Sequence, residues 1–177
     1  ENVAIFLSGH GNRSGGHFEF VCHDNSSSNS FDWFSLELVI DAMIRNGAHV
    51  LVMIDACHAG QLANRFFGDV RTKATTDNPN GGGLILLTSC VPSQLSIDGG
   101  TNGLFTKALL EALRGEADVD TDSAVTVKEV RSYLFWRMKE LVRISSNLPA
   151  MDWPEQDELC MWSSVIPETL VLSRTPG

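Results

Sequence analysis

The stretch "VLVMIDACHAG", residues 50–60, decides the fold class of this chain. It opens with a short apolar run, residues 50–54, which is typical of a buried strand of a parallel sheet. The run ends in Asp55 and is followed by Cys57 and His58. Reactive groups of open α/β sheets gather outside the carboxyl ends of the strands. The stretch therefore predicts a sheet and, at its edge, a site that contains a thiol.

The rest of the chain alternates strand and helix patterns. Apolar runs predict buried strands over residues 2–8 and 84–89, and a polar–apolar alternation predicts a half-buried strand over residues 17–22. Helical spacing of apolar residues and a last short strand complete the pattern; the helices cover residues 31–45, 102–114 and 126–142, and the strand residues 169–173. Together they predict an α/β fold with a mostly parallel central sheet flanked by helices.

Composition limits the classes of protein and partner. With 177 residues, of which 43% are hydrophobic, the chain has the size of one domain with its own core. The net charge of −9 disfavours binding to nucleic acid or to an anionic membrane, and the apolar runs are far shorter than the roughly 20 residues that span a bilayer. Four widely spread cysteines do not make a disulfide scaffold, so we expect a reducing, cytoplasmic setting. We expect a single domain over residues 1–177.

A histidine joins the thiol as a candidate for catalysis. His10 follows the strand at residues 2–8 within the run Gly9, His10, Gly11, which reads as a loop. If the two strands are parallel neighbours, His10 and Cys57 face one crevice, as a general base and a nucleophile. The backbone N–H groups of Gly11 and Cys57 are then candidate donors to an oxyanion. His58 is a weaker candidate for the base, because it adjoins Cys57 and its side chain should point elsewhere.

Three quoted segments carry a resemblance to a known family. "FLSGHGN", residues 6–12, and "VMIDACHAG", residues 52–60, resemble the histidine and cysteine motifs of the caspase-like cysteine peptidases. The form D-A-C-H-A-G is most similar to the D-S-C-H-S-G of metacaspases. "LTSCVPSQLSIDGGTNGLFTKALLEALRG", residues 87–115, is similar to the segment that follows the nucleophile in bacterial and protist members. The resemblance covers residues 2–143 and implies a caspase-like fold.

The resemblance also implies roles for single residues. His10 would be the general base and acid, Cys57 the nucleophile that forms the acyl-enzyme, and Gly11 an oxyanion donor. Asp55 would line the specificity pocket with Ser8 beside it, and a carboxylate there pairs with the guanidinium or ammonium group of a basic substrate. The resemblance thus implies an endopeptidase that cleaves proteins or peptides after Arg or Lys.

Simpler interpretations of the pocket residues stay open. Asp55 also suits a helix cap or a structural salt bridge, and Ser8 suits a bond to the backbone. Asp98, in "SIDGG", either adds acidity to the pocket or belongs to an ordinary turn. Two alternative functions also remain: a caspase-like peptidase that cleaves after Asn or Asp, and an inactive module that binds partners.

Two features concern the completeness and processing of the enzyme. In the family, earlier strands and a helix precede the histidine strand and supply a second acidic residue to the pocket, and this chain starts at that strand. We therefore expect a companion N-terminal segment or chain. Residues 65–83 are polar and rich in glycine, and they predict a mobile loop where the family carries its intersubunit linker. Self-cleavage is expected there after Arg65, Arg71 or Lys73, unless the loop is merely solvated and charged.

Metal sites take second place to the thiol chemistry, which requires no cofactor. "DVDTDSAVTVKE", residues 118–129, has the spacing of a calcium-binding loop, with Ser123 in place of the turn glycine. Its acidic residues at positions one, three, five and twelve are Asp118, Asp120, Asp122 and Glu129. Calcium is thus a candidate activator, although caspase-like domains also use such turns as plain connectors. A zinc site from Cys22, His23, Cys57 and His58 is disfavoured, because it lacks separated ligand pairs and would consume the nucleophile.

Overall fold

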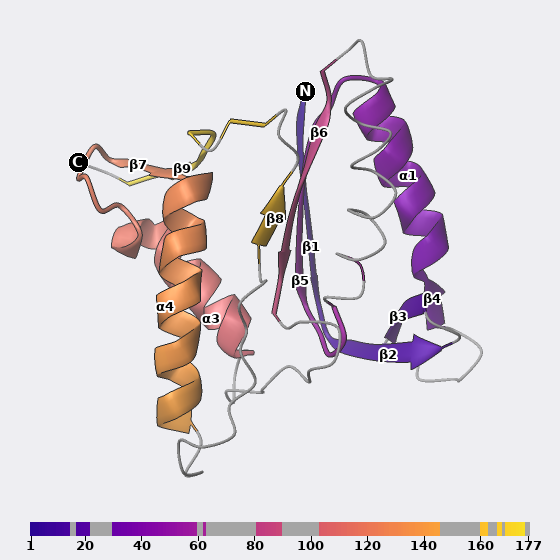
Figure 1. Ribbon diagram of the computed structural model, residues 1–177, viewed down its shortest axis with the longest axis horizontal. Helices are drawn as coiled ribbons and strands as arrows, with labels where there is room; N and C mark the ends of the chain where they lie inside the picture. Colours follow the sequence, from indigo (N-terminus) through magenta and orange to yellow (C-terminus); the bar gives the residue numbers. More distant parts are fainter. Residues whose placement is uncertain are drawn as a thin grey trace.

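The computed structural model shows a sheet between two layers of helices (Figure 1). It describes residues 1–14, 17–21, 30–59, 62, 81–89, 103–145, 160–162, 166–167 and 169–175. The central sheet has the strand order β1-β5-β6-β8. Its strands are β1 (Asn2–Ser8), β5 (His49–Asp55), β6 (Gly83–Thr88) and β8 (Cys160–Trp162). The first three are parallel and β8 is antiparallel to β6, so the predicted α/β fold with a mostly parallel sheet is confirmed.

Each face of the sheet packs against its own helices. Val50, Val52 and Ile54 of β5 lie in one apolar core with Ile40 and Ile44 of α1 (Trp33–Arg45). The other core joins Met53 of β5 with α3 (Leu104–Glu111) and α4 (Val127–Ser145). Figure 1 shows α1 on one side of the sheet and α3 and α4 on the other. This two-sided burial explains why β5 and β6 read as continuous apolar runs.

A small antiparallel sheet follows β1. It has the order β2-β3-β4, with β2 (His10–Ser14), β3 (His17–Val21) and β4 (Ser30–Asp32). The sequence predicted a loop at Gly9, His10 and Gly11, but His10 opens β2 and pairs with Val21. The strand forms because it pairs with β3, and the glycine-flanked residues of β2 show no local strand pattern from which this pairing could be predicted.

Helices α3 and α4 are joined through an irregular segment. After α3 the chain forms the π-helical turn η1 (Ala112–Glu116), in which Gly115 has a φ of 113°. That backbone angle favours glycine and agrees with the predicted helix end. The short strand β7 (Ala124–Thr126) then pairs with β9 (Val171–Arg174), so the predicted tail strand is present within a residue or two. In the part of the chain that the structure describes, no helix has the length and apolar character needed to cross a membrane.

Candidate active site

The carboxyl ends of β1 and β5 lie side by side. The parallel register pairs Ser8 with Asp55, and the N–H of Gly9 donates to the carbonyl of Asp55 at 3.0 Å. His10 comes two residues after Ser8, and Cys57 comes two residues after Asp55. The two halves of the predicted dyad therefore leave the same edge of the sheet on neighbouring strands, which is the arrangement that the sequence required.

His10 and Cys57 differ in their surroundings. His10 is exposed at the start of β2, and an added Cβ on the preceding Gly9 would collide with the ring of Phe20. Cys57 is half-buried and carries a thiol rather than a disulfide. It lies in a tight turn in which the N–H of Ala59 donates to the carbonyl of Ala56 at 3.3 Å. The next residue, His58, has a φ of 62°, so the chain bends sharply just after the thiol.

Asp55 connects the cysteine strand to helix α3. Its side chain is 4% exposed. The carboxylate accepts the N–H of Thr106 at 3.0 Å and also the Thr106 hydroxyl. The residue before α3, Gly103, offers no capping side chain, and a Cβ there would collide with the carboxylate. Asp55, the last residue of β5, therefore caps the N-terminal end of α3, where the helix dipole favours a negative charge.

Ser8 is the partner of Asp55 in the parallel ladder. Because partners in a parallel ladder project to the same face, Ser8 and Asp55 share the face that packs on α3. Ser8 is exposed, whereas Asp55 is buried. The structure thus brings together the two residues assigned to the specificity pocket and gives Asp55 a second partner, Thr106, that the sequence did not indicate.

Ser89 is a further buried polar residue, and it contacts Ala56, the residue before Cys57. It follows β6, is 1% exposed, and its hydroxyl bonds both the N–H and the carbonyl of Ala56 at 3.1 Å. Sequence reasoning did not single it out. The available signal was its place directly after a buried strand, in the segment "LTSC".

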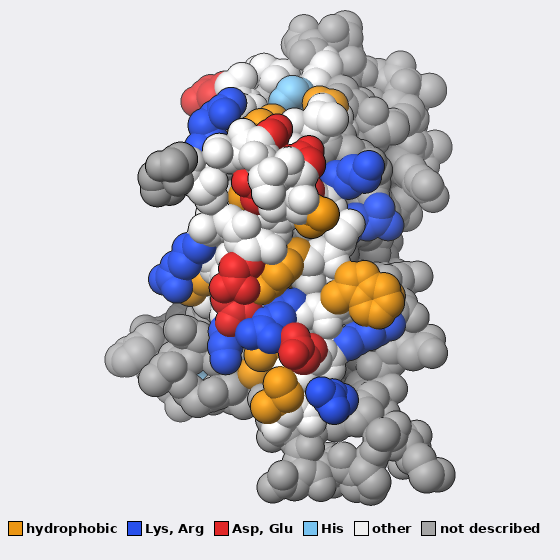
Figure 2. Space-filling view, turned by 90° about the vertical axis from the view of Figure 1, so that its left-hand side faces the viewer, with side chains coloured by type: hydrophobic (Ala, Val, Ile, Leu, Met, Phe, Trp, Pro, Cys, Tyr) orange, Lys and Arg blue, Asp and Glu red, His pale blue; other side chains and the backbone are white. Residues whose placement is uncertain are grey.

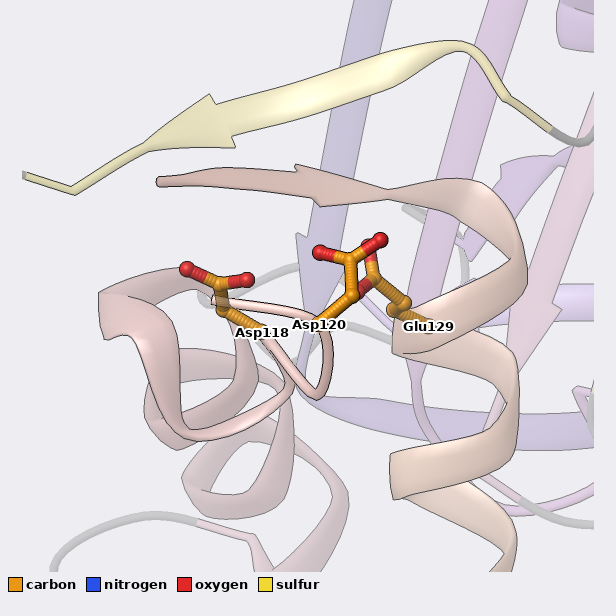
Figure 3. Close-up of side chains that lie close together, drawn as sticks. All are labelled: Asp118, Asp120 and Glu129. Carbon is orange, nitrogen blue, oxygen red and sulfur yellow. The ribbon is translucent and has the colours of Figure 1, made fainter. Parts of the chain in front are cut away.

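The acidic segment between η1 and α4 forms a compact loop (Figure 3). One carboxylate oxygen each from Asp118, Asp120 and Glu129 lies within 4.8 Å of the others. Asp118 accepts the N–H of Ser123 at 3.0 Å, and Ser123 has a φ of 64° at the position of the turn glycine. Asp122 instead accepts the N–H of Ala124 at 2.8 Å.

Glu129 also stabilises the start of α4. Its carboxylate accepts the hydroxyl of Thr126 at 2.6 Å and the N–H of the same residue at 2.8 Å. The N–H of Glu129 donates in return to the Thr126 hydroxyl oxygen at 3.4 Å, which completes the reciprocal arrangement of a capping box. The Thr126 hydroxyl lowers the pKa of Glu129 below its ordinary value, so the carboxylate stays charged at neutral pH.

Four predicted site residues lie outside the described part of the chain: Arg65, Arg71, Lys73 and Asp98. Their roles stay predictions. Cys22 and His23, of the disfavoured zinc site, lie outside it as well.

Comparison with known families agrees with this geometry. The family model described as "Caspase domain" matches residues 1–153. This range includes the carboxyl ends of β1 and β5 and the helices α3 and α4. This chain belongs to the caspase domain family. The caspase-like fold is therefore confirmed, and membership supports a cysteine peptidase, a hydrolase of peptide bonds. No curated protein and no solved structure gave a significant match to the chain.

Proposed function

We propose that this caspase-domain chain is a cysteine endopeptidase of the metacaspase type, cleaving after Arg or Lys. The observation that carries the proposal is the register of β1 and β5, which makes His10 and Cys57 the equivalent residues beyond two paired strand ends. A nucleophile and a base from neighbouring strands of one sheet edge are the minimum for acyl transfer.

The proposed reaction has two steps. The Cys57 sulfur, after losing its proton to His10, attacks the substrate carbonyl carbon, and the N–H groups of Cys57 and Gly11 stabilise the oxyanion. When the C–N bond breaks, His10 returns the proton to the leaving amine and an acyl-enzyme remains. Water, activated by His10, then attacks the thioester and releases the acid and the thiol.

Asp55 and Ser8 are proposed to receive the basic side chain. The carboxylate of Asp55 accepts the N–H and the hydroxyl of Thr106, and its negative charge suits pairing with a guanidinium or ammonium group. Asp98 is proposed to add negative charge. A buried carboxylate at this place would repel the carboxylate of an aspartyl substrate, which separates this specificity from cleavage after Asp.

A panel of fluorogenic peptides that differ only in the residue before the cut tests the proposal. We expect turnover of arginyl and lysyl peptides and none with Cys57→Ala. Asp55→Asn should lower kcat/KM for basic peptides by about 10-fold or more, because a neutral amide loses the charge-assisted pairing but keeps an acceptor for Thr106. Preferred turnover of asparaginyl or aspartyl peptides would contradict the specificity. If the peptides bind but are not cleaved, and an arginyl electrophile does not label Cys57, the result would favour a partner-binding module.

A companion segment is proposed to cover strand β1. Among the described strands only β5 pairs with β1, and Phe6 on the α3 side of the sheet is 46% exposed. A cavity of about 170 Å³ lies at the amino ends of β1 and β5, and it is lined largely by apolar residues that include Val3, Leu51 and Ile85. An extended segment at this edge would bury apolar surface and supply backbone partners, as edge strands require.

Calcium is proposed as an activator that binds the loop of residues 118–129. The support is the carboxylate group of Asp118, Asp120 and Glu129 together with the left-handed backbone of Ser123. Oxygen ligands at these positions are those that Ca²⁺ prefers, and the peptidase chemistry itself requires no metal.

A further inference from the structure

Three hydrogen bonds join Ser89 to Ile54 and Ala56, in the segment that leads into Cys57. Its N–H donates to the carbonyl of Ile54 at 2.9 Å. The N–H of Ala56 donates to the Ser89 Oγ at 3.1 Å, and the hydroxyl donates back to the carbonyl of Ala56 at 3.1 Å. Ala56 and Ser89 are 0% and 1% exposed, so these bonds lie in the interior.

The hydroxyl replaces a backbone group of the ladder. Ile54 pairs with Thr88, so Ser89 stands opposite Asp55, and in a regular parallel ladder its carbonyl would accept the N–H of Ala56. Here the side-chain oxygen accepts that N–H instead. The chain can therefore leave the sheet at Ala56 and enter the tight turn of Cys57 while this buried N–H keeps a partner.

The second bond acts on the nucleophile's own amide. The carbonyl of Ala56 and the N–H of Cys57 belong to one planar trans peptide and point in opposite directions. The Ser89 hydroxyl, at 3.1 Å, and the N–H of Ala59, at 3.3 Å, both donate to this carbonyl, and by holding it they fix the direction of the Cys57 N–H. That N–H is one of the two oxyanion donors in the mechanism above, and such donors act only when they are aimed at the oxyanion.

We infer that Ser89 is a positioning residue that orients the backbone amide of Cys57 for oxyanion stabilisation. The inference rests on the proposed peptidase function. Ser89→Ala should lower kcat for an arginyl peptide roughly ten- to a hundred-fold with little change in KM. The fall should be smaller than for complete removal of an oxyanion donor, because a misaligned N–H still gives part of the transition-state stabilisation. Alkylation of Cys57 by iodoacetamide forms no oxyanion, so its rate should stay near that of the wild type.

Two further variants separate positioning from folding. Ser89→Thr keeps the hydroxyl and should restore kcat. Leu84 is buried in the same strand, β6, at the end far from Ser89. Leu84→Val should therefore lower the melting temperature without altering the ratio of the rate of peptide turnover to the rate of alkylation. Amide exchange at Ala56, followed by NMR, provides a readout that needs no catalysis. It should accelerate at least ten-fold in Ser89→Ala and remain slow in Ser89→Thr and Leu84→Val.

These measurements distinguish a failure of the Ser89 inference from a failure of the proposed peptidase function. Unchanged exchange at Ala56 in Ser89→Ala would overturn the inference, and so would a fall of turnover and alkylation by one common factor. A wild type that is alkylated at Cys57 yet cleaves no peptide would overturn the proposed function and, with it, the role of Ser89 in positioning an oxyanion donor. Faster exchange in that case would still support the anchoring of Ala56 by the Ser89 hydroxyl.

Discussion

At the scale of single residues, Asp55 joins segments that are far apart in the sequence. Its carbonyl accepts the N–H of Gly9 from the histidine segment, and its carboxylate accepts Thr106 at the start of α3. A buried carboxylate is costly unless it is hydrogen-bonded, so these contacts make its burial possible. The residue that the sequence assigned to substrate recognition is therefore also part of the framework.

The Thr106 hydroxyl gives a testable measure of this framework. Thr106→Val removes one donor to the buried carboxylate and keeps the shape of the side chain, so we expect a loss of about 1–3 kcal/mol in the free energy of unfolding. Thr106→Ser retains the hydroxyl and is the matched control. Urea denaturation measures both; equal stability of the valine and serine variants would contradict the role of the hydroxyl.

Gly103 is expected to tolerate no side chain. Gly103→Ala places a Cβ against the Asp55 carboxylate and must displace it from the end of α3. We expect a lower melting temperature and a larger effect on peptide turnover than from an exposed control such as Lys107→Ala on the same helix. Wild-type stability and activity of Gly103→Ala would show that the carboxylate can move without cost.

At the scale of elements, an ion pair fastens α4 to α3. Arg137 bonds both carboxylate oxygens of Glu111, at 2.7 and 3.1 Å, and Tyr133 donates to the same carboxylate at 3.3 Å. Figure 2 shows this side of the molecule, where acidic and basic side chains lie next to one another among scattered hydrophobic ones. Two parallel bonds between a planar guanidinium and a carboxylate fix the relative position of the helices more firmly than an ordinary surface pair.

This pair predicts a pH dependence of stability. The bond from Arg137 lowers the pKa of Glu111, so the pair stabilises the fold above the unfolded pKa of about 4.3 and loses this effect as pH falls through the folded pKa. We expect Arg137→Met to cost about 1.5–3 kcal/mol at pH 7 and progressively less in acid. Arg45→Met, in an exposed pair with Asp41, is the control and should change little. A cost independent of pH would contradict the ionic origin.

The acidic loop gives a second prediction at this scale. Calcium should raise the melting temperature of the wild type, because a ligand that binds only the folded state stabilises it. Asp120→Asn should abolish the rise, whereas Asp41→Asn, an exposed carboxylate on α1, should leave it intact. Differential scanning calorimetry with and without calcium measures the effect. No rise in the wild type would reduce the loop to a connector between helices.

At the scale of the whole molecule, we propose that the chain processes itself within residues 65–83. Incubation of the wild type should yield two fragments, the first ending at Arg65, Arg71 or Lys73 and the second beginning at the next residue. Replacing all three by Gln should keep the chain intact. Intact-protein mass spectrometry identifies the cut. Fragments that also form in Cys57→Ala would point to a contaminating protease, and an uncut wild type would contradict the proposal.

The sequence predicted the fold where the local pattern carried it. Strand β1 has the predicted ends, and β5 extends only one residue further at either side, since both are marked by dense apolar runs. Strand β2 was missed because its pairing with β3 leaves no pattern in glycine-flanked residues. The capping of α3 by Asp55 joins positions 51 residues apart, and the bonds of Ser89 to Ala56 join positions 33 apart, so no local periodicity could predict them.

The parallel pairing of β1 with β5 has a consequence for when the candidate site forms during folding. Paired residues such as Ser8 and Asp55 are 47 positions apart, so the ladder closes only after a long loop has been ordered, and such contacts form slowly. A chain still emerging from the ribosome therefore has a thiol and an imidazole but no edge on which they meet. In the proposed peptidase, proteolytic activity would therefore appear only once the sheet is complete, and an unfolded chain would not cleave other proteins.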